Sequence, residues 1–506
     1  MRTRNAKTPR TIDILLSPHS PALLVVTPLL AAPLIVLVRR STLAWLVAML
    51  TVVACVVFAW DLITQTAGGH TISYAMGSWA PPLGIEYRVD TANAFVGFIV
   101  AVIALFVVPY CRVSIAAEVR AEEQYLFYAM LMLCLSGLLG ILLTGDAFNL
   151  FVFLEISSLA TYVLIAMGRD RRALVAAYQY LLMGTIGATL YVIGVGMLYL
   201  ETGTLNLHDM ANRLGMADTR ALLAGLAFIT VGISLKIALF PLHLWLPNAY
   251  AYSPSSVSAF LAATATKVCI YVLMRFFFSI FGATVVFDSR ATGTILLALS
   301  LAAMFVPAVV AIYQKNVKRL LAYSSVSQIG YITLGVALDS VSGATAAMAH
   351  LFNHALTKGA LFLVLGGAVM RCGGATLDRL AGLGRTMPLT AFAFTIGGLS
   401  LIGIPGTAGF ISKWYLVLGA IERGYWWLVA LIVASSLIAI AYVWRFVEMA
   451  YFREPDPAAA KLNEAPPAML IPAWIMVTAC IYFGLDTSYT LSGARLAAKV
   501  LLGLVQ

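Results

Sequence analysis

The chain has 506 residues, of which 61% are hydrophobic and only 11% are charged, and its mean hydropathy is +0.93. Because soluble domains carry about 25% charged residues, this composition excludes a soluble globular protein, a disordered chain and a secreted disulfide scaffold. The net charge of +10 is spread over short segments between apolar runs, which excludes a nucleic-acid binder with one basic patch. The sequence therefore predicts an all-α polytopic membrane protein.

Apolar runs long enough to cross a bilayer recur along the whole chain, since a spanning helix needs about 20 such residues. We expect fourteen helices, at 21–38, 41–60, 91–110, 124–143, 147–167, 173–200, 219–240, 254–281, 292–313, 320–338, 342–370, 388–419, 424–450 and 467–485. Residues 70–90 alternate in polarity around Pro81-Pro82-Leu83-Gly84, which predicts a small hairpin outside the membrane. The last stretch, 488–506, predicts a short helix lying along the membrane surface.

Basic residues at the ends of spans favour the cytoplasmic side of a membrane. Fifteen of them fall in the odd-numbered connections and five in the even-numbered ones. The first set is Arg39, Arg40, Arg112, Arg120, Arg169, Arg171, Arg172, Lys315, Lys318, Arg319, Arg371, Arg379, Arg385, Arg453 and Lys461, and the second is Arg88, Arg213, Arg220, Arg290 and Arg423. The bias predicts a multi-pass protein of the inner (cytoplasmic) membrane with both termini outside, although the N-terminal tail, with Arg2, Arg4, Lys7 and Arg10, opposes this orientation.

The six cysteines lie singly, mostly inside apolar runs, and no CxxC pair is present. We expect them to be small packing residues and expect no metal site. No strand followed by a GxGxxG turn occurs, so the sequence predicts no nucleotide or flavin cofactor.

Ionisable residues set deep in the apolar runs carry the main functional signal. They are Glu155, Lys236, Lys267, His350, His354, Lys358 and Lys413. Each charge at the centre of a membrane helix costs roughly 2.5–3.5 kcal/mol, so four without a role would cost on the order of 10 kcal/mol. The alternative is that they snorkel or pair to hold helices together, and for Lys358 both interpretations stay open. Glu155 lies about nine residues, or roughly 14 Å, into its helix, which argues against snorkelling.

These residue types suit proton transfer. A lysine that moves toward and away from a carboxylate can load and unload a proton near neutral pH. Histidine titrates in the same range and can receive a proton on one ring nitrogen and release it from the other. His350 and His354 are four residues apart, hence on one face of a helix, which favours a relay over two isolated core histidines.

Two of the predicted helices contain a break beside a lysine. Pro241 follows Lys236 by five residues, and Pro405 lies in a glycine-rich segment ahead of Lys413. Because proline has no N–H, these breaks free the carbonyls of Ile237 and Leu401. Paired breaks are typical of inverted-repeat transporters with a path at mid-membrane, and the alternative is that they are kinks that only shape packing.

Five stretches resemble the proton-translocating, antiporter-like subunits shared by respiratory complex I, membrane-bound hydrogenases and Mrp-type cation/proton antiporters. They are DAFNLFVFLEIS (146–157), KIALFPLHLWLPNAYAYSPSSVS (236–258), KRLLAYSSVSQIGY (318–331), HLFNHALTKGALFL (350–363) and GIPGTAGFISKW (403–414). The resemblance implies two inverted five-helix repeats, at 124–281 and 292–450. Residues 1–123 would hold helices one to three, and 451–506 the fourteenth helix and the interfacial segment.

The resemblance also implies roles for individual residues. In that family a Glu–Lys pair forms the proton switch, further Lys and His side chains continue a hydrated central axis, and a last Lys or Glu gates the far exit. By motif these roles fall on Glu155 with Lys236, on Lys267 with His354 or His350, and on Lys413. His243, in the loop before the eighth helix, would either help proton entry or cap the loop.

Two features bear on which member the chain resembles. GSWAPPLGIEYRVD (77–90) is similar to the corresponding hairpin of the D-type subunits of Mrp antiporters, and Lys413 stands where M-type complex I subunits have a Glu. The resemblance implies a subunit of a multi-subunit Na⁺/H⁺ antiporter, with other membrane subunits as partners. Protons are the ions expected to pass through this subunit, and passage of Na⁺ through it stays open. The alternative is a proton-pumping M- or N-like subunit of an NADH:quinone oxidoreductase or hydrogenase complex. In both cases redox chemistry would belong to partner subunits.

Overall fold

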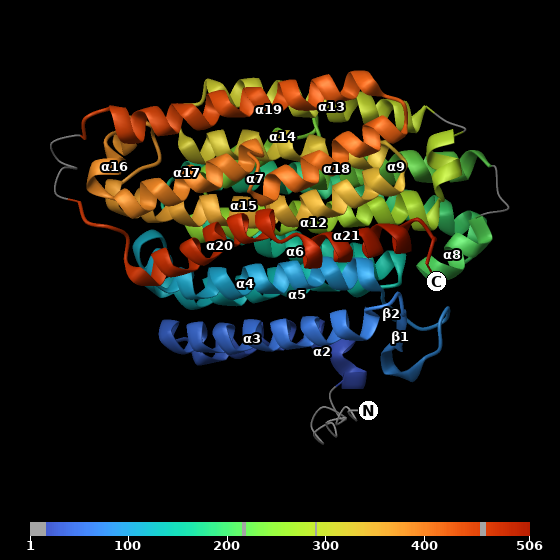
Figure 1. The fold of residues 1–506 in the computed structure, drawn as a ribbon. Helices are drawn as coiled ribbons and strands as arrows, with labels where there is room; N and C mark the ends of the chain where they lie inside the picture. The colour runs from blue at the N-terminus through green and yellow to red at the C-terminus, as the bar shows by residue number, and fades with distance from the viewer. Residues whose placement is uncertain (1–16, 215–218, 289–290, 456–461, 506) are drawn as a thin grey trace, which may run out of the picture.

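The computed structural model describes residues 17–214, 219–288, 291–455 and 462–505. The described residues form a bundle of roughly aligned α-helices with one two-stranded sheet at one end (Figure 1). Thirteen helices of the described part are long and apolar enough to cross a membrane, or up to fourteen if one bent pair counts as a single span. The prediction of an all-α polytopic membrane protein is confirmed.

The helices follow the predicted spans closely. The first half contains α2 (Ser20–Val38), α3 (Ser41–Thr66), α4 (Thr91–Glu118), α5 (Gln124–Leu143), α6 (Ala147–Ala166), α7 (Arg172–Thr202), α8 (Leu207–Leu214), α9 (Arg220–Ile237), α10 (Trp245–Tyr252), α11 (Ser255–Ala263) and α12 (Ala265–Met274). The second half contains α13 (Thr292–Ile312), α14 (Val317–Ala337), α15 (Val341–Cys372), α16 (Leu383–Thr386), α17 (Pro388–Ile402), α18 (Ala408–Glu422), α19 (Trp426–Val447), α20 (Pro467–Leu485) and α21 (Ser488–Leu501). Most of the predicted boundaries lie within a few residues of these.

The predicted hairpin is present. Strand β1 (Ile72–Ala75) pairs antiparallel with β2 (Glu86–Val89), with Ile72 opposite Val89. Asp90 follows β2 directly and caps α4, accepting hydrogen bonds from the backbone N–H groups of Ala92 and Asn93. An N-cap of this kind satisfies donors that the first helical turn leaves free, so the hairpin leads straight into the third span.

The helix that contains Lys236 is interrupted. α9 ends at Ile237, where Ala238 adopts a left-handed conformation with φ of 63°. The backbone N–H of Leu239 reaches back to the Ser234 carbonyl, which closes the helix end. The chain then crosses a short loop before α10 begins at Trp245.

The predicted single helix at 388–419 is two helices of 15 residues each, α17 and α18. Gly403 at the end of α17 has φ of 88°, a conformation that favours glycine. A Cβ atom added to Gly409 would overlap the Ser400 carbonyl oxygen. The glycine cluster therefore allows the two helices to meet at close range.

The prediction that 488–506 forms a surface helix is wrong. Helix α21 lies in line with α20 and packs along α15 and α4 (Figure 1). It buries Ala494, Ala497, Ala498 and Leu501, a stripe of mostly small side chains that allows close helix packing. The apolar face that indicated a surface helix therefore packs against other helices of the bundle.

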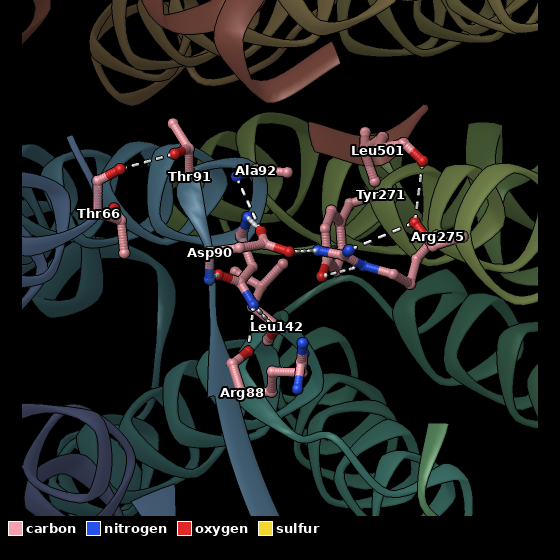
Figure 2. Close-up of polar contacts among 11 residues, drawn as sticks. Thr66, Arg88, Asp90, Thr91, Ala92, Leu142, Tyr271, Arg275 and Leu501 are labelled. Carbon is pink, nitrogen blue, oxygen red and sulfur yellow. Dashed lines mark hydrogen bonds and ion pairs between the residues drawn. The ribbon is translucent and has the colours of Figure 1, made fainter. Parts of the chain in front are cut away.

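A buried ion pair joins the start of α4 to the residues that follow α12 (Figure 2). Arg275 Nη2 lies 2.6 Å from Asp90 Oδ2, and Arg275 Nε donates to Tyr271 Oη at 3.0 Å. Ser279 Oγ donates to the Leu501 carbonyl at 3.1 Å, which attaches the end of α21 to the same cluster. This cluster connects three segments that are distant in the sequence.

One basic residue in the charge count is buried, which its predicted place in a loop did not indicate. Lys318, taken as a loop residue, lies in the first turn of α14 and is buried. The four basic residues of the N-terminal tail, together with Arg290 and Lys461, lie outside the described residues. The orientation in the membrane and the boundaries of the two inverted repeats stay predictions.

Replacing Arg275 by Met should destabilise the protein, because it leaves the Asp90 carboxylate buried without its cation. Loss of one partner from a buried pair costs about 3–5 kcal/mol, which would lower the thermal denaturation midpoint of the purified protein. Arg453→Met is the matched control, since its pair with Glu448 has side chains 62% and 40% exposed and is worth under about 1 kcal/mol. Equal midpoints for the two variants would contradict the structural role of Arg275.

Candidate functional site

The predicted ionisable residues lie on five helices that are layered through the bundle: α6, α9, α12, α15 and α18 (Figure 1). Direct packing joins α9 to α12 and α15 to α18, and α11 packs against α15. Lys236, Lys267, His350, His354, Lys358 and Lys413 are all buried. The structure thus gathers these predicted residues in the interior.

Glu155 and Lys236 meet, as the resemblance implies, but not as a tight pair. Lys236 Nζ lies 3.5 Å from Glu155 Oε1 and 2.8 Å from Ser158 Oγ, so the serine is the closer partner. The Lys236 side chain is 2% exposed and that of Glu155 is 24% exposed. The carboxylate therefore lies at the edge of the protein and is less buried than the sequence indicated.

The sequence analysis did not identify Ser158 as a partner of Lys236. It follows Glu155 by three residues and so shares its face of α6, which is the signal that a search along the helix face would have found. Its hydroxyl oxygen lies closer to the Lys236 ammonium than the Glu155 carboxylate does.

Lys267 lies beside an interruption of its helix, at which the sequence has neither proline nor glycine. Thr264 separates α11 from α12 with φ of −122° and ψ of −62°. Lys267 Nζ donates to the Ala262 carbonyl and lies 3.4 Å from Thr266 Oγ1. The interrupted helix therefore supplies the lysine with a backbone oxygen that a continuous helix would keep for itself.

Lys358 belongs to the same interior group. Its Nζ donates to the Leu321 carbonyl at 2.9 Å and also to Ser324 Oγ. Lys267 and Lys358 can therefore each carry a positive charge, and the oxygen atoms that they contact carry no formal charge.

His350 and His354 share one face of α15, as their spacing predicts. Their ring centroids are 6.1 Å apart and the rings are nearly parallel. His350 Nδ1 lies 2.7 Å from Ser412 Oγ, and its Nε2 lies 3.0 Å from Gln328 Oε1. Neither ring nitrogen of His354 has a hydrogen-bond partner among the described residues. A buried polar group normally has a hydrogen-bond partner, so the two ring nitrogens of His354 are candidate sites for binding a water molecule or a proton.

Lys413 is the last of the buried ionisable residues along the chain. Its Nζ donates to the Ile402 carbonyl at 2.8 Å and to Ser436 Oγ at 3.1 Å, and it lies 4.5 Å from the centre of the Tyr331 ring. Tyr331 also contacts His350, with ring centroids 5.7 Å apart. The end of α17, created by the break before Pro405, supplies the carbonyl that holds this ammonium.

His243 lies in the loop between α9 and α10. Its ring stacks on Phe240, with centroids 5.2 Å apart, and its edge faces Tyr323. Its position beside the break at Pro241 fits both a proton-transfer and a packing role, so proton entry at His243 stays a prediction.

The chemistry of these groups is that of cations held by neutral oxygens. Carbonyl and hydroxyl groups can stabilise an ammonium without trapping it in a strong ion pair, which leaves its proton free to pass to a neighbouring base. Within the described residues no group of three or more His, Cys, Asp or Glu side chains is placed to hold a metal ion. Five of the six cysteines are buried and all six are free thiols.

Comparison with known proteins identifies the family. The family described as NADH:quinone oxidoreductase/Mrp antiporter, transmembrane, matches residues 144–439, a segment that holds every ionisable site residue. The N subunit of the NADH-quinone oxidoreductase of Desulforudis audaxviator is 39% identical over 94% of this chain and 97% of that protein. The D subunit of the Na⁺/H⁺ antiporter of Bacillus subtilis is 29% identical over 94% of this chain and 96% of that protein. A chain of the Mrp complex from Dietzia sp. superimposes with a TM-score of 0.88 at 26% identity, covering 96% of this chain and 98% of that one. The chain therefore belongs to the NADH:quinone oxidoreductase/Mrp antiporter transmembrane family.

Proposed function

We propose that this chain moves protons across a membrane as one subunit of a multi-subunit complex. The observation that carries the proposal is the interior series of titratable groups from Lys236 through Lys267, Lys358 and the two histidines to Lys413. A charge in the bilayer is costly and usually marks an ion pathway. Here several such charges lie on neighbouring helices, with the Glu155 carboxylate at one end of the series.

The Glu155–Lys236 pair serves as the switch. When the Lys236 amine lies against Glu155, the carboxylate favours its protonated, charged form; when the amine turns to Ser158, that electrostatic support weakens. The released proton passes from Nζ to a neighbouring base on the path toward Lys267 and His354. Lys413, at the far end of the series, delivers the proton to the opposite side.

We propose a Mrp-type Na⁺/H⁺ antiporter as the parent complex. The hairpin before α4, Lys413 on α18 and the similarity to the Mrp structure support this assignment. The alternative is a proton-pumping subunit of an NADH:quinone oxidoreductase, which the 39% identity to an N subunit supports. In the second case electron transfer in partner subunits would drive the same residues.

The proposed setting is the inner (cytoplasmic) membrane, with other membrane subunits as partners. The excess of basic residues in the odd-numbered connections supports a cytoplasmic location for them, which places the hairpin and α21's end outside. Two inverted repeats, 124–281 and 292–450, are supported by the corresponding breaks after Lys236 and before Lys413.

The central test uses inverted vesicles that contain the full set of partner subunits. Glu155→Ala and Lys236→Ala should each abolish the collapse of a pH gradient on addition of NaCl, because the switch loses one member, while the complex stays assembled. Unimpaired exchange in an assembled variant would contradict the switch. If the unaltered complex ignores Na⁺ but pumps protons when given an electron donor, the redox alternative holds with the same residues.

Ser158→Ala tests the hydroxyl that sequence reasoning missed. Loss of a hydrogen bond to a charged group costs about 1.5–3 kcal/mol, so we expect exchange in the same vesicles to slow by roughly tenfold or more. Ser157→Ala is the control, since that hydroxyl donates to the Leu154 carbonyl of its own helix. Equal rates in the two variants would remove Ser158 from the switch.

Lys413→Glu asks whether the exit needs a lysine or any titratable group. The Ile402 carbonyl, which accepts from Lys413, repels an ionised carboxylate but accepts a hydrogen bond from a protonated one. We therefore expect partial exchange with its optimum moved to lower pH, and no exchange in Lys413→Met, measured as a pH profile. Complete loss in an assembled Lys413→Glu complex would instead indicate a lysine-specific exit.

A further inference from the structure

The imidazole ring of His350 is held at both of its nitrogen atoms by side chains of other helices. Its Nδ1 lies 2.7 Å from Ser412 Oγ on α18, and its Nε2 lies 3.0 Å from Gln328 Oε1 on α14. All three side chains are buried. Both α14 and α18 pack directly against α15, so the ring joins three helices through polar contacts in the interior of the bundle.

The contact with Gln328 determines which ring nitrogen carries the proton. An amide oxygen accepts hydrogen bonds and has no proton to donate, so the contact between Gln328 Oε1 and Nε2 requires a proton on Nε2. A neutral imidazole has a single ring proton. Nδ1 is therefore the bare nitrogen of the neutral ring, and it accepts the hydroxyl proton of Ser412.

The hydroxyl of Ser412 has a second acceptor within reach. Its oxygen also lies 3.3 Å from the carbonyl oxygen of Gly409. When the hydroxyl proton points to Nδ1, the ring is neutral. When it points to the Gly409 carbonyl instead, the hydroxyl oxygen can accept a hydrogen bond from a protonated Nδ1. The hydrogen bond between Nε2 and Gln328 is the same in both arrangements.

We propose that Gln328 is a positioning residue that keeps Nε2 of His350 protonated, so that His350 exchanges its second proton only through Nδ1 and Ser412. On loading, Ser412 passes its hydroxyl proton to Nδ1 and takes up a proton from a water molecule or an ammonium group on its other side. On unloading, both transfers run in reverse. No bond to Nε2 forms or breaks in either direction.

This arrangement gives the two histidines different roles. A histidine that relays a proton receives it on one ring nitrogen and releases it from the other, and Nε2 of His350 faces only an amide oxygen. Neither ring nitrogen of His354 has a partner among the described residues, so both are free for transfer. His350 is then a side station that holds a proton near Tyr331, whose ring also lies 4.5 Å from Lys413 Nζ.

This inference rests on the proposed proton function, but the position of the ring proton is measured without transport. The complete complex, with nitrogen-15 in its histidines, is studied in lipid bilayers by solid-state NMR at an alkaline pH, at which imidazole groups are neutral. The signals of His350 are those that disappear in His350→Asn. We expect a protonated Nε2 and a bare Nδ1.

Two substitutions of Gln328 test its part in this arrangement. Gln328→Met removes the acceptor of Nε2, so the form protonated on Nδ1, which can donate to Ser412 Oγ, should become populated. Gln328→Glu puts an acceptor oxygen back and should restore the proton on Nε2. Gln314→Met is the control, because the Gln314 side chain donates to the Val310 carbonyl, and the ring proton of His350 should stay in place.

A proton on Nδ1 and none on Nε2 in the unaltered complex would overturn the role of Gln328, and this result does not depend on the folding of any variant. The same His350 signals in Gln328→Met as in the unaltered complex, or an equal change in Gln314→Met, would also overturn it.

The different roles of the two histidines are tested by exchange in the inverted vesicles. His354→Asn should slow exchange by about a hundredfold or more, as expected for a proton-transfer group. His350→Asn should slow it by less than about tenfold, as expected for the loss of a neutral hydrogen bond. Equal losses would overturn the side-station role. Intact exchange in Glu155→Ala, together with a protonated Nε2 on His350, would refute the proposed switch and leave the role of Gln328 standing.

Discussion

An ammonium group inside a lipid bilayer has no bulk water to solvate it, so the protein must supply oxygen atoms at the same depth. For two of the buried lysines, those oxygens come from interruptions in the helices. The end of α17 presents the Ile402 carbonyl to Lys413, and the interruption at Thr264 presents the Ala262 carbonyl to Lys267. Lys236 lies in the last turn of α9, next to the hydroxyl of Ser158.

The same constraint accounts for other parts of the fold. Glycines at 403 and 409 are needed where the two halves of a broken helix turn and approach each other. The serine-rich sequence from 253 to 258 contains the start of α11, and there the Ser253 carbonyl accepts from Lys318 while the Ser255 N–H donates to Glu118. Neutral oxygens, rather than carboxylates, hold most of the lysines, which suits groups that must give up a proton as well as hold one.

Much of this could be predicted from the sequence, because hydropathy and proline positions report directly on spans and breaks. The spans, the hairpin and the buried lysines follow from those signals. The interruption at Thr264 could not be predicted, since the segment contains no helix breaker and the distortion depends on packing around Lys267. Ser158 resembles any polar residue of a membrane helix until its distance to Lys236 is known.

Two further differences between the sequence predictions and the structure have a common origin. Helix α21 has the amphipathic spacing of a surface helix, and only its alanine contacts with α15 and α4 show that it packs in the bundle. Lys318 has the sequence position of a topology-setting loop residue, and only its burial in α14 sets it apart. Periodicity and charge counts describe which side of a helix is polar, but they do not show which neighbour covers that side.

Proton transfer through this chain requires a connected polar path between Lys236 and Lys413. A cryo-EM map of the complete complex, detailed enough to show ordered water and recorded in one acidic and one alkaline buffer, tests it. We expect water density to link Lys236, Lys267, His354 and Lys413, and we expect the Lys236 amine to lie closer to Glu155 in one buffer than in the other. A dry apolar gap between these residues in both buffers, with Lys236 unmoved, would contradict it.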